Sequence, residues 1–339
     1  MAEEIISTGD LFDEDTRQGA SDDATEVETR CHQVPSSMHG WRVDRTLTAL
    51  TPEFSRSYLQ QLMTDGAVQL NGAPARKASA KVKVGDAVQV ALRPTQQAMA
   101  FVAQPMALDV VFEDEHLMVI VKPAGLVVHP AAGNWSGTLL NGLLAHHAGA
   151  ASLPRAGIVH RLDKDTSGLM LVGKSRQAVE GLVRAIASRD VKREYLAIAH
   201  GAWRGHEPVV VDQPIGRDVR NRLRMAVISA GGVGGKPAKT TIIPKACVGD
   251  VSLVVCQLHT GRTHQIRVHM AWLGHPLLGD VLYGGKPRLG IVRQALHAYR
   301  LRLNHPISGA ALTFVSEPPA DFATAADEAG LHYNEPNTE

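Results

Sequence analysis

Cysteine is scarce in this chain of 339 residues, which contains only Cys31, Cys247 and Cys256. Three cysteines cannot build a disulfide framework, and their scarcity is typical of a protein from a reducing compartment. Long apolar runs are also missing, which argues against a membrane-spanning helix. The first residues are acidic and no apolar core follows them, so they do not predict a signal peptide. We therefore expect a cytoplasmic protein without a membrane partner.

Charge is nearly balanced overall, with a formal net charge of +1, but it is unevenly distributed. Residues 1–30 contain ten Asp and Glu against two Arg, whereas the rest of the chain carries 33 Lys and Arg against 24 Asp and Glu. A basic body behind an acidic leader favours a polyanionic partner. On charge alone, an ordinary charged surface with a solvated tail remains the alternative. The leader, residues 1–38, has few large apolar side chains, and we expect it to be disordered.

A small basic module is predicted at residues 40–93. Val43, Leu47 and Leu50 recur at helical spacing, and Ser55 is placed to cap a second helix. The pair at 71–72, Asn-Gly, predicts a hairpin turn. Basic residues cluster in the same module, at Arg42, Arg45, Arg56, Arg76, Lys77, Lys81 and Lys83.

The module resembles the S4 RNA-binding domain in three segments, at residues 55–57, 68–72 and 84–86. It departs from that domain in the first helix, where Val43-Asp44-Arg45 replaces the commoner Arg-Leu-Asp-Lys. The resemblance implies contacts with RNA phosphates and backbone shape rather than with bases. The candidate contacts in this module are Arg56, Arg76 and Lys77.

A linker at residues 94–100 is expected to lead into a second domain at 101–325, followed by a tail at 326–339. Apolar segments at 108–112, 117–121, 251–258 and 295–303 predict strands, and the spacing of apolar residues between 175 and 189 predicts an amphipathic helix. Strands that follow one another, or are separated by single helices, indicate an α+β fold with a mixed, largely antiparallel sheet and flanking helices.

The run from His160 to Leu171 places several polar and charged side chains next to apolar residues. Buried charges need partners, so Asp163 is the first candidate for chemistry. Tyr195 begins a strand after the amphipathic helix, and Arg267 lies where a strand turns into a helix. A carboxylate beside an arginine stays ionised and serves better as a nucleophile or base than as an acid.

Three other interpretations are weaker on physical grounds. Residues 163–166 have the spacing of an aspartyl phosphotransferase, which would need magnesium, but no long apolar strand precedes them. Residues 231–236 suggest a phosphate loop, but the spacing is one residue short and Pro237 replaces the required Ser or Thr. Cys256, His259, His264 and His269 suggest zinc, but His264 and His269 would lie about 140° apart around a helix, so they would not converge on one ion. We expect no metal and no cofactor.

Three motifs resemble those of the RluA-family pseudouridine synthases: GIVHRLDKDTSG at 157–168, KREYLA at 192–197 and GRTHQIR at 261–267. The resemblance covers about residues 108–322, with the S4-like module ahead of it. Residues 129–134 and 137–141 are most similar to the members that modify large-subunit ribosomal RNA. The resemblance implies isomerisation of a flipped-out uridine in RNA.

The same resemblance implies roles for individual residues. Asp163 would be the catalytic aspartate, acting as nucleophile or base toward the ribose, and Arg267 would be its partner. Tyr195 would stack on the flipped uracil and help to remove its C5 proton, and Arg161 would fill the space that the base leaves. Other candidate RNA contacts in this domain, some of which also shape the loop, are His160, Lys164, Arg262 and His264.

The expected substrate is a stem-loop of large-subunit ribosomal RNA, bound by a monomer without an obligate protein partner. Two alternatives stay open. One is a synthase that acts on another RNA such as tRNA, and the other is a non-catalytic RNA-binding factor for ribosome assembly.

Overall fold

The computed structural model of the protein describes residues 28–92, 98–131, 133–221, 223–228 and 234–333. The described residues form two compact units, which are separated between residues 95 and 96. Most of the linker predicted at 94–100 lies outside the described residues, and its end forms the 3-10 helix η2 (Ala98–Phe101). No described helix is both long and apolar enough to cross a membrane.

The first unit packs two helices, α1 (Val43–Leu50) and α2 (Arg56–Thr64), against an antiparallel sheet. Its described strands lie in the order β1 (Glu28–Gln33), β4 (Ala87–Leu92), β2 (Val68–Leu70) and β3 (Ala73–Pro74). Ser55 caps α2 by accepting a hydrogen bond from the Tyr58 N–H. Asn71 and Gly72 both have positive φ, 50° and 80°, as a tight hairpin turn requires.

The first strand corrects the predicted extent of the disordered leader. Residues 28–33 form β1, which pairs with β4 along its whole length, and the 3-10 helix η1 (Ser36–Met38) follows. This strand was not predicted because its side chains are polar and mostly exposed, and the sequence therefore lacks the alternation of apolar residues that indicates a strand. Its place is decided by backbone pairing with β4. Residues 1–27 lie outside the described part of the chain.

Asp44 is the buried polar centre of the first unit. Its side chain is 0% exposed and accepts hydrogen bonds from Arg42 at 3.0 Å, Arg56 at 2.7 Å and Gln60 at 3.0 Å. The hydrogen bond from Arg42 lowers the pKa of Asp44 far below its ordinary value, and those from Arg56 and Gln60 add to this against the opposing effect of burial. One carboxylate therefore ties α1 to α2.

We expect Asp44→Asn to lower the unfolding free energy of the full chain by about 2 kcal/mol, because charge-assisted hydrogen bonds are lost from a buried site. The pKa of Asp44 is lower in the folded state, so its contribution is present above the pKa of an unfolded aspartate, about 4, and disappears as pH falls below it. Urea unfolding between pH 3 and pH 7 measures both effects. The exposed Asp65→Asn is the control, and equal losses in the two variants would contradict the assignment.

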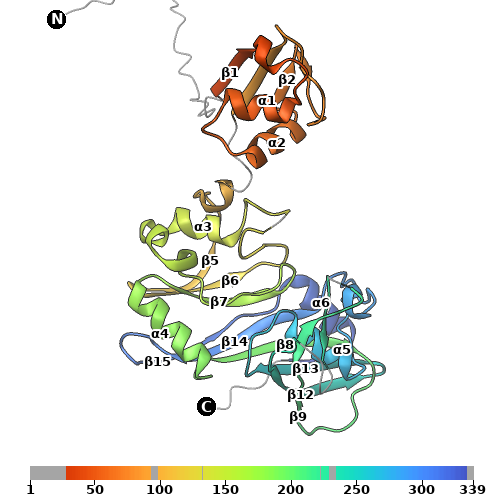
Figure 1. Ribbon diagram of the computed structural model, residues 1–339. Coiled ribbons are helices and arrows are strands. Elements are labelled where there is room, and N and C mark those ends of the chain that lie inside the picture. Colours follow the sequence, from red (N-terminus) through yellow and green to blue (C-terminus); the bar gives the residue numbers. More distant parts are fainter. Residues whose placement is uncertain (1–27, 93–97, 132, 222, 229–233, 334–339) are drawn as a thin grey trace, which may run out of the picture. The chain divides into compact units, whose positions relative to one another are not determined.

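The second unit is built on a mixed sheet, which confirms the predicted α+β class (Figure 1). Its described strands run in the order β5 (Asp109–Glu113), β6 (Leu117–Lys122), β7 (Ser167–Gly173), β14 (Leu296–Asn304), β8 (Lys192–His200), β13 (Val251–Leu258), β12 (Lys239–Val248) and β9 (Val209–Asp212). β15 (Ala311–Val315) pairs with the second half of β14. The pairing of β7 with β14 is parallel, and the other named pairs are antiparallel.

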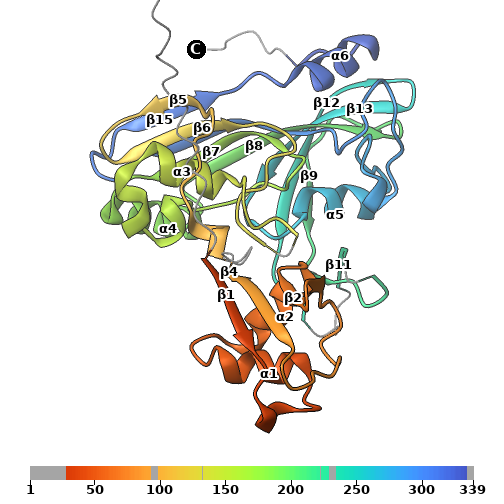
Figure 2. The same ribbon diagram turned by 90° about the horizontal axis from the view of Figure 1, so that it is seen from above.

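Alternate residues of the central strands fill different cores on the two faces of the sheet. On one face, residues of α3 (Leu139–His146) and α5 (Gln265–Trp272) share a core with Tyr195. On the other, α4 (Arg176–Ala187) contributes Leu182 to one cluster and α6 (Ala320–Glu328) contributes Phe322 to another. Figure 2 shows α6 on the opposite side of the sheet from α3 and α5.

The remaining elements are short. Two 3-10 helices, η3 (Ala148–Ser152) and η4 (Pro154–Gly157), precede the His160 run, and η5 (Val281–Tyr283) follows α5. A small antiparallel ribbon joins β10 (Ile215–Arg217) to β11 (Met225–Val227). The predicted tail at 326–339 begins too early, since Ala326 and Leu331 are fully buried with α6. Residues 334–339 lie outside the described part.

Candidate active site

Three central strands bring the polar motifs together. Gly168, at the start of β7, pairs with Ala298 of β14, and Ala298 also pairs with Tyr195 of β8. Gly168 has a φ of +112°, and a Cβ there would lie 2.3 Å from the Ala298 carbonyl oxygen, so only glycine permits this close approach. The loop that carries Asp163 is thereby placed beside Tyr195.

The Asp163 loop is held from beneath by a buried lysine. Lys122 is 0% exposed, and its Nζ donates to the carbonyl oxygens of Pro123 at 2.7 Å, Leu126 at 3.0 Å and Lys164 at 2.9 Å. Burial lowers the pKa of Lys122 to about 8, although the charges of Asp165 and Asp163 oppose this. The ammonium group is therefore still protonated at pH 7 and fixes the backbone next to Asp163. No role was predicted from the sequence for Lys122, which follows the apolar segment predicted as a strand at 117–121.

Arg267 joins two carboxylates. Its Nη1 donates to Asp163 Oδ2 at 3.1 Å, while its Nε and Nη2 form a two-point pair with Asp280 at 2.8 Å each. Burial alone would lower the pKa of Arg267, but Asp280 and then Asp163 raise it above its ordinary value. The expected pair of Arg267 with Asp163 is present. Asp280, which is 2% exposed, is a second residue that the sequence did not predict, and its only signal was a carboxylate within the otherwise apolar and glycine-containing segment GDVLYG at 279–284.

His264 and Tyr283 close the other side of Asp163. His264 Nε2 lies 3.9 Å from Asp163 Oδ1, and its Nδ1 hydrogen-bonds to the Tyr283 hydroxyl at 2.8 Å. Burial is the main cause that lowers the pKa of His264. The ring of Tyr283 also lies 5.0 Å from the Arg267 guanidinium. His264 has a φ of +55°, a strained value for a histidine, and such strain is found where surrounding contacts impose it.

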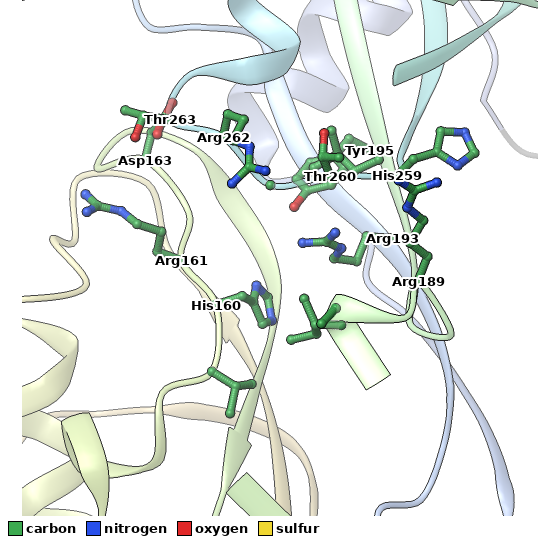
Figure 3. Close-up of a pocket in the computed structure, with 15 residues that line it drawn as sticks. His160, Arg161, Asp163, Arg189, Arg193, Tyr195, His259, Thr260, Arg262 and Thr263 are labelled. Atoms are coloured by element: carbon green, nitrogen blue, oxygen red, sulfur yellow. The ribbon is translucent and has the colours of Figure 1, made fainter. Parts of the chain in front are cut away.

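Asp163 and Tyr195 line a cavity of about 520 Å³, which is in the usual range for ligand sites. Figure 3 shows Tyr195, Arg193, Arg262, Arg161 and Asp163 around it. Tyr195 is 5% exposed, and burial raises the pKa of its phenol. Its hydroxyl therefore stays protonated at neutral pH.

The other candidate RNA contacts of this domain differ in the partners and exposure of their side chains. His160 Nε2 accepts a hydrogen bond from the Leu171 N–H at 2.9 Å, which ties the loop to β7, and burial lowers the pKa of His160 to about 3. Arg161 and Lys164 are exposed on the same loop. Arg262 is exposed and donates through Nε to the Pro237 carbonyl oxygen at 3.0 Å. All except Lys164 line the 520 Å³ cavity.

In the first unit, the three candidate RNA contacts differ in whether their side chains are already bound within the unit. Arg56 is engaged by Asp44 through one guanidinium nitrogen, although its side chain is 58% exposed. Arg76 and Lys77 are exposed.

The histidines weighed as zinc ligands have other partners. His269 Nδ1 bonds to the Thr240 hydroxyl at 2.8 Å, and its Nε2 to the Gln213 carbonyl at 3.1 Å. Cys256 is fully buried, and burial raises the pKa of its thiol. Among the described residues, no group of three or more His, Cys, Asp and Glu is arranged to hold a metal ion.

Comparison with known proteins identifies the family of this chain. Residues 116–272 match the profile of the RNA pseudouridylate synthases, and residues 41–88 match that of the S4 domain. The ribosomal large subunit pseudouridine synthase D of Neisseria meningitidis serogroup A is 47% identical over 315 residues, which cover 88% of this chain and 82% of that protein. The chain belongs to the RNA pseudouridylate synthase family. It isomerises uridine in RNA to pseudouridine.

Other relatives agree with this membership. The protein of the same description from Nitrosomonas europaea is 44% identical and covers 86% of this chain and 85% of its own. The solved structure of human RNA pseudouridylate synthase domain containing 1 is 27% identical, with a TM-score of 0.50 over 64% of this synthase and 86% of that chain. That of domain containing 4, 23% identical with a TM-score of 0.55 over 67% of this chain and 95% of that one, shows the shared fold.

Asp280 should matter for the rate of this pseudouridine synthase although it does not face the pocket. In Asp280→Asn, Arg267 loses its two-point anchor, and misplacing a reacting group by about 1 Å can cost about 100-fold in rate. We expect kcat for pseudouridine formation to fall by about that factor with a much smaller change in KM.

The matched control is Asp250→Asn, because Asp250 also pairs with an arginine, Arg288, but is 70% exposed. Exposed pairs contribute little, so this variant should keep its kcat. An Asp280→Asn enzyme with unchanged kcat would show that Asp163 does not depend on the Asp280 anchor.

Proposed function

We propose that this synthase modifies uridines in a stem-loop of large-subunit ribosomal RNA, with Asp163 as its catalytic residue. Relatives at 44–47% identity, covering more than 80% of both chains, are described as large-subunit ribosomal enzymes, which supports the choice of RNA. The protein acts as a monomer in the cytoplasm and needs no cofactor.

The single observation that carries the catalytic assignment is the position of the Asp163 carboxylate. It lies at the pocket that Tyr195 lines, and the guanidinium of Arg267 faces it at 3.1 Å. Asp280 and Asp163 raise the pKa of Arg267, so a permanent positive charge faces the Asp163 carboxylate and orients it. A carboxylate held in this way acts on the ribose as a nucleophile at C1′ or as a base.

In the nucleophilic route the carboxylate oxygen bonds to C1′ as the N1–C1′ bond breaks and its electron pair leaves with uracil N1; the uracil turns, C5 bonds to C1′, and the carboxylate is released. In the other route the carboxylate takes a proton from the ribose and returns it after C5 has bonded to C1′. In both routes the proton that C5 loses is balanced by the one that N1 gains, so substrate and product are isomers.

Tyr195 and Arg161 serve the flipped base. The Tyr195 phenol stays neutral because burial raises its pKa, so stacking on uracil suits it better than removing the C5 proton as a phenolate. Arg161 is exposed on the rim of the same pocket and is long enough to occupy the gap left in the RNA. Lys164, Arg262 and His264 extend this contact with RNA.

The S4 domain adds affinity rather than chemistry. Arg76 and Lys77 are exposed, and Arg56 keeps donors free beside its bond to Asp44. Phosphate contacts of this kind position an RNA without reading its sequence.

Asp163→Asn should abolish pseudouridine formation by the purified protein on large-subunit RNA transcripts, because the amide can neither attack C1′ nor accept a proton. RNA binding in a filter or gel-shift assay should persist. Asp165→Asn, two residues away, is the matched control and should keep most of the activity, since the main-chain carbonyl of Asp165, not its side chain, takes the bond from Arg293 at 2.9 Å. Pseudouridine formation by Asp163→Asn would show that Asp163 is not the catalytic residue.

The choice of RNA is tested separately by mapping pseudouridines in cells with and without the gene. Sites in large-subunit ribosomal RNA should revert to uridine and return with the wild-type gene but not with Asp163→Asn. Loss of sites in tRNA alone would overturn the proposed substrate. Loss of none, with RNA still bound, would favour a non-catalytic assembly factor.

A further inference from the structure

The wall of the active-site pocket carries more positive charge than its one carboxylate balances. Arg161, Arg189, Arg193 and Arg262 line the pocket, whereas Asp163 is its only acidic lining residue in the described chain. Asp163 already has Arg267 as its partner. The pocket is therefore electrostatically incomplete without an anion.

Arg193 is the most unusual of these groups, because it is 5% exposed and yet forms no ion pair with any carboxylate of the described residues. In the described part of the chain, its Nε is buried without a hydrogen-bond partner. The neighbouring carboxylate does not serve it, since Glu194 pairs with Arg300 at 3.4 Å and Arg302 at 3.5 Å. Burying a charge without a partner is strongly unfavourable, so an anionic ligand at this guanidinium would be bound favourably.

His160 provides a second unused donor at the same pocket. Its Nε2 accepts from the Leu171 N–H, so the neutral ring carries its proton on Nδ1. In the described chain, this Nδ1 is also buried without a partner. Two donors from separate segments, β8 and the loop before β7, thus line one cavity, and Figure 3 shows both side chains at its wall.

Two further observations place Arg193 at this cavity. Gly261 also lines the cavity and lies so close to the guanidinium that a Cβ there would be 3.1 Å from Arg193 Nη1. Tyr195, two residues along the same strand, lines the same cavity, which places Arg193 next to the site of the flipped uracil. A neutral uracil carbonyl would not balance the charge of Arg193, whereas a phosphate would.

We propose that Arg193 and His160 form a phosphate subsite that binds a backbone phosphate of the nucleotide adjoining the flipped uridine. Arg189 and Arg262 at the rim add to its field. The subsite rests on the proposed function in one respect, namely that the phosphate belongs to the RNA being modified. It positions the substrate and takes no part in bond breaking.

The first experiment uses inorganic phosphate and the full chain without RNA. Phosphate should raise the Tm of the wild type, and the fitted dissociation constant should rise about tenfold or more in Arg193→Gln, because a charge-assisted pair is lost. Arg193→Lys, which keeps the charge, should retain part of the effect. Arg184→Gln is the matched control, since Arg184 is an exposed arginine of α4 that does not line the pocket.

Stability without phosphate gives a second readout. If Arg193 is an unpaired buried charge, Arg193→Gln should be as stable as the wild type or more stable in phosphate-free buffer. Lower stability with an unchanged response to phosphate would overturn the proposal, because Arg193 would then be a structural residue.

The second experiment separates RNA phosphate from free phosphate. In an RNA that the wild type modifies, each linkage around the target uridine is replaced singly by a neutral methylphosphonate. One replacement should raise KM for the wild type about tenfold while leaving Arg193→Gln, whose KM is already raised, nearly unaffected. Equal effects on both proteins at every linkage would refute an RNA phosphate at Arg193.

Failure of the subsite and failure of the proposed function remain distinguishable. The phosphate titration needs no RNA, and the methylphosphonate series needs only some uridine-containing substrate. An enzyme that modifies tRNA instead of large-subunit RNA would refute the proposed substrate and leave both tests of Arg193 decisive.

Discussion

The active site depends on one buried guanidinium shared by two carboxylates. Arg267 is anchored by Asp280 at two points and reaches Asp163 with its remaining nitrogen. Asp280 neutralises the arginine and fixes its plane, so the second carboxylate can remain partly exposed at the pocket and still face a fixed positive charge. In a single Asp–Arg pair, burial would fix the geometry but exclude the substrate, whereas exposure would admit the substrate but loosen the geometry. With three residues, the buried pair of Arg267 and Asp280 fixes the geometry, and Asp163 remains accessible to the substrate.

The sheet supplies the geometry that this arrangement needs. Parallel pairing of β7 with β14, beside antiparallel pairing of β14 with β8, brings Gly168 and Tyr195 to the same residue, Ala298. The loop before β7 thus meets the face of β8 that carries Tyr195. Lys122 beneath this loop uses its ammonium group to satisfy three carbonyl oxygens, which holds irregular backbone rigid where a regular strand has ended.

The hydrogen-bond donors around the pocket divide into those with acceptors inside the protein and those without. Arg267 and Lys122 have their partners inside the protein and maintain the structure. Arg193 and His160 keep buried donors without acceptors in the described chain, on the wall that the RNA approaches. An enzyme derives much of its precision from its substrate contacts, and unsatisfied donors reserved for the substrate are a direct way to obtain it.

By itself, the sequence determined the class of fold, the helices and hairpin of the S4 domain and the motifs around Asp163, Tyr195 and Arg267, because local periodicity and turn chemistry are written in neighbouring residues. It failed at β1, whose polar residues show no alternation, and at the end of α6, whose burial depends on distant strands. Only the tertiary structure decided that Asp280 anchors Arg267, that Lys122 supports the Asp163 loop and that the Arg193 Nε has no partner among the described residues. Each of these features depends on which charged and polar groups, far apart in the chain, come close together in the fold. The energy of a charge depends on its surroundings in space rather than on its neighbours in sequence.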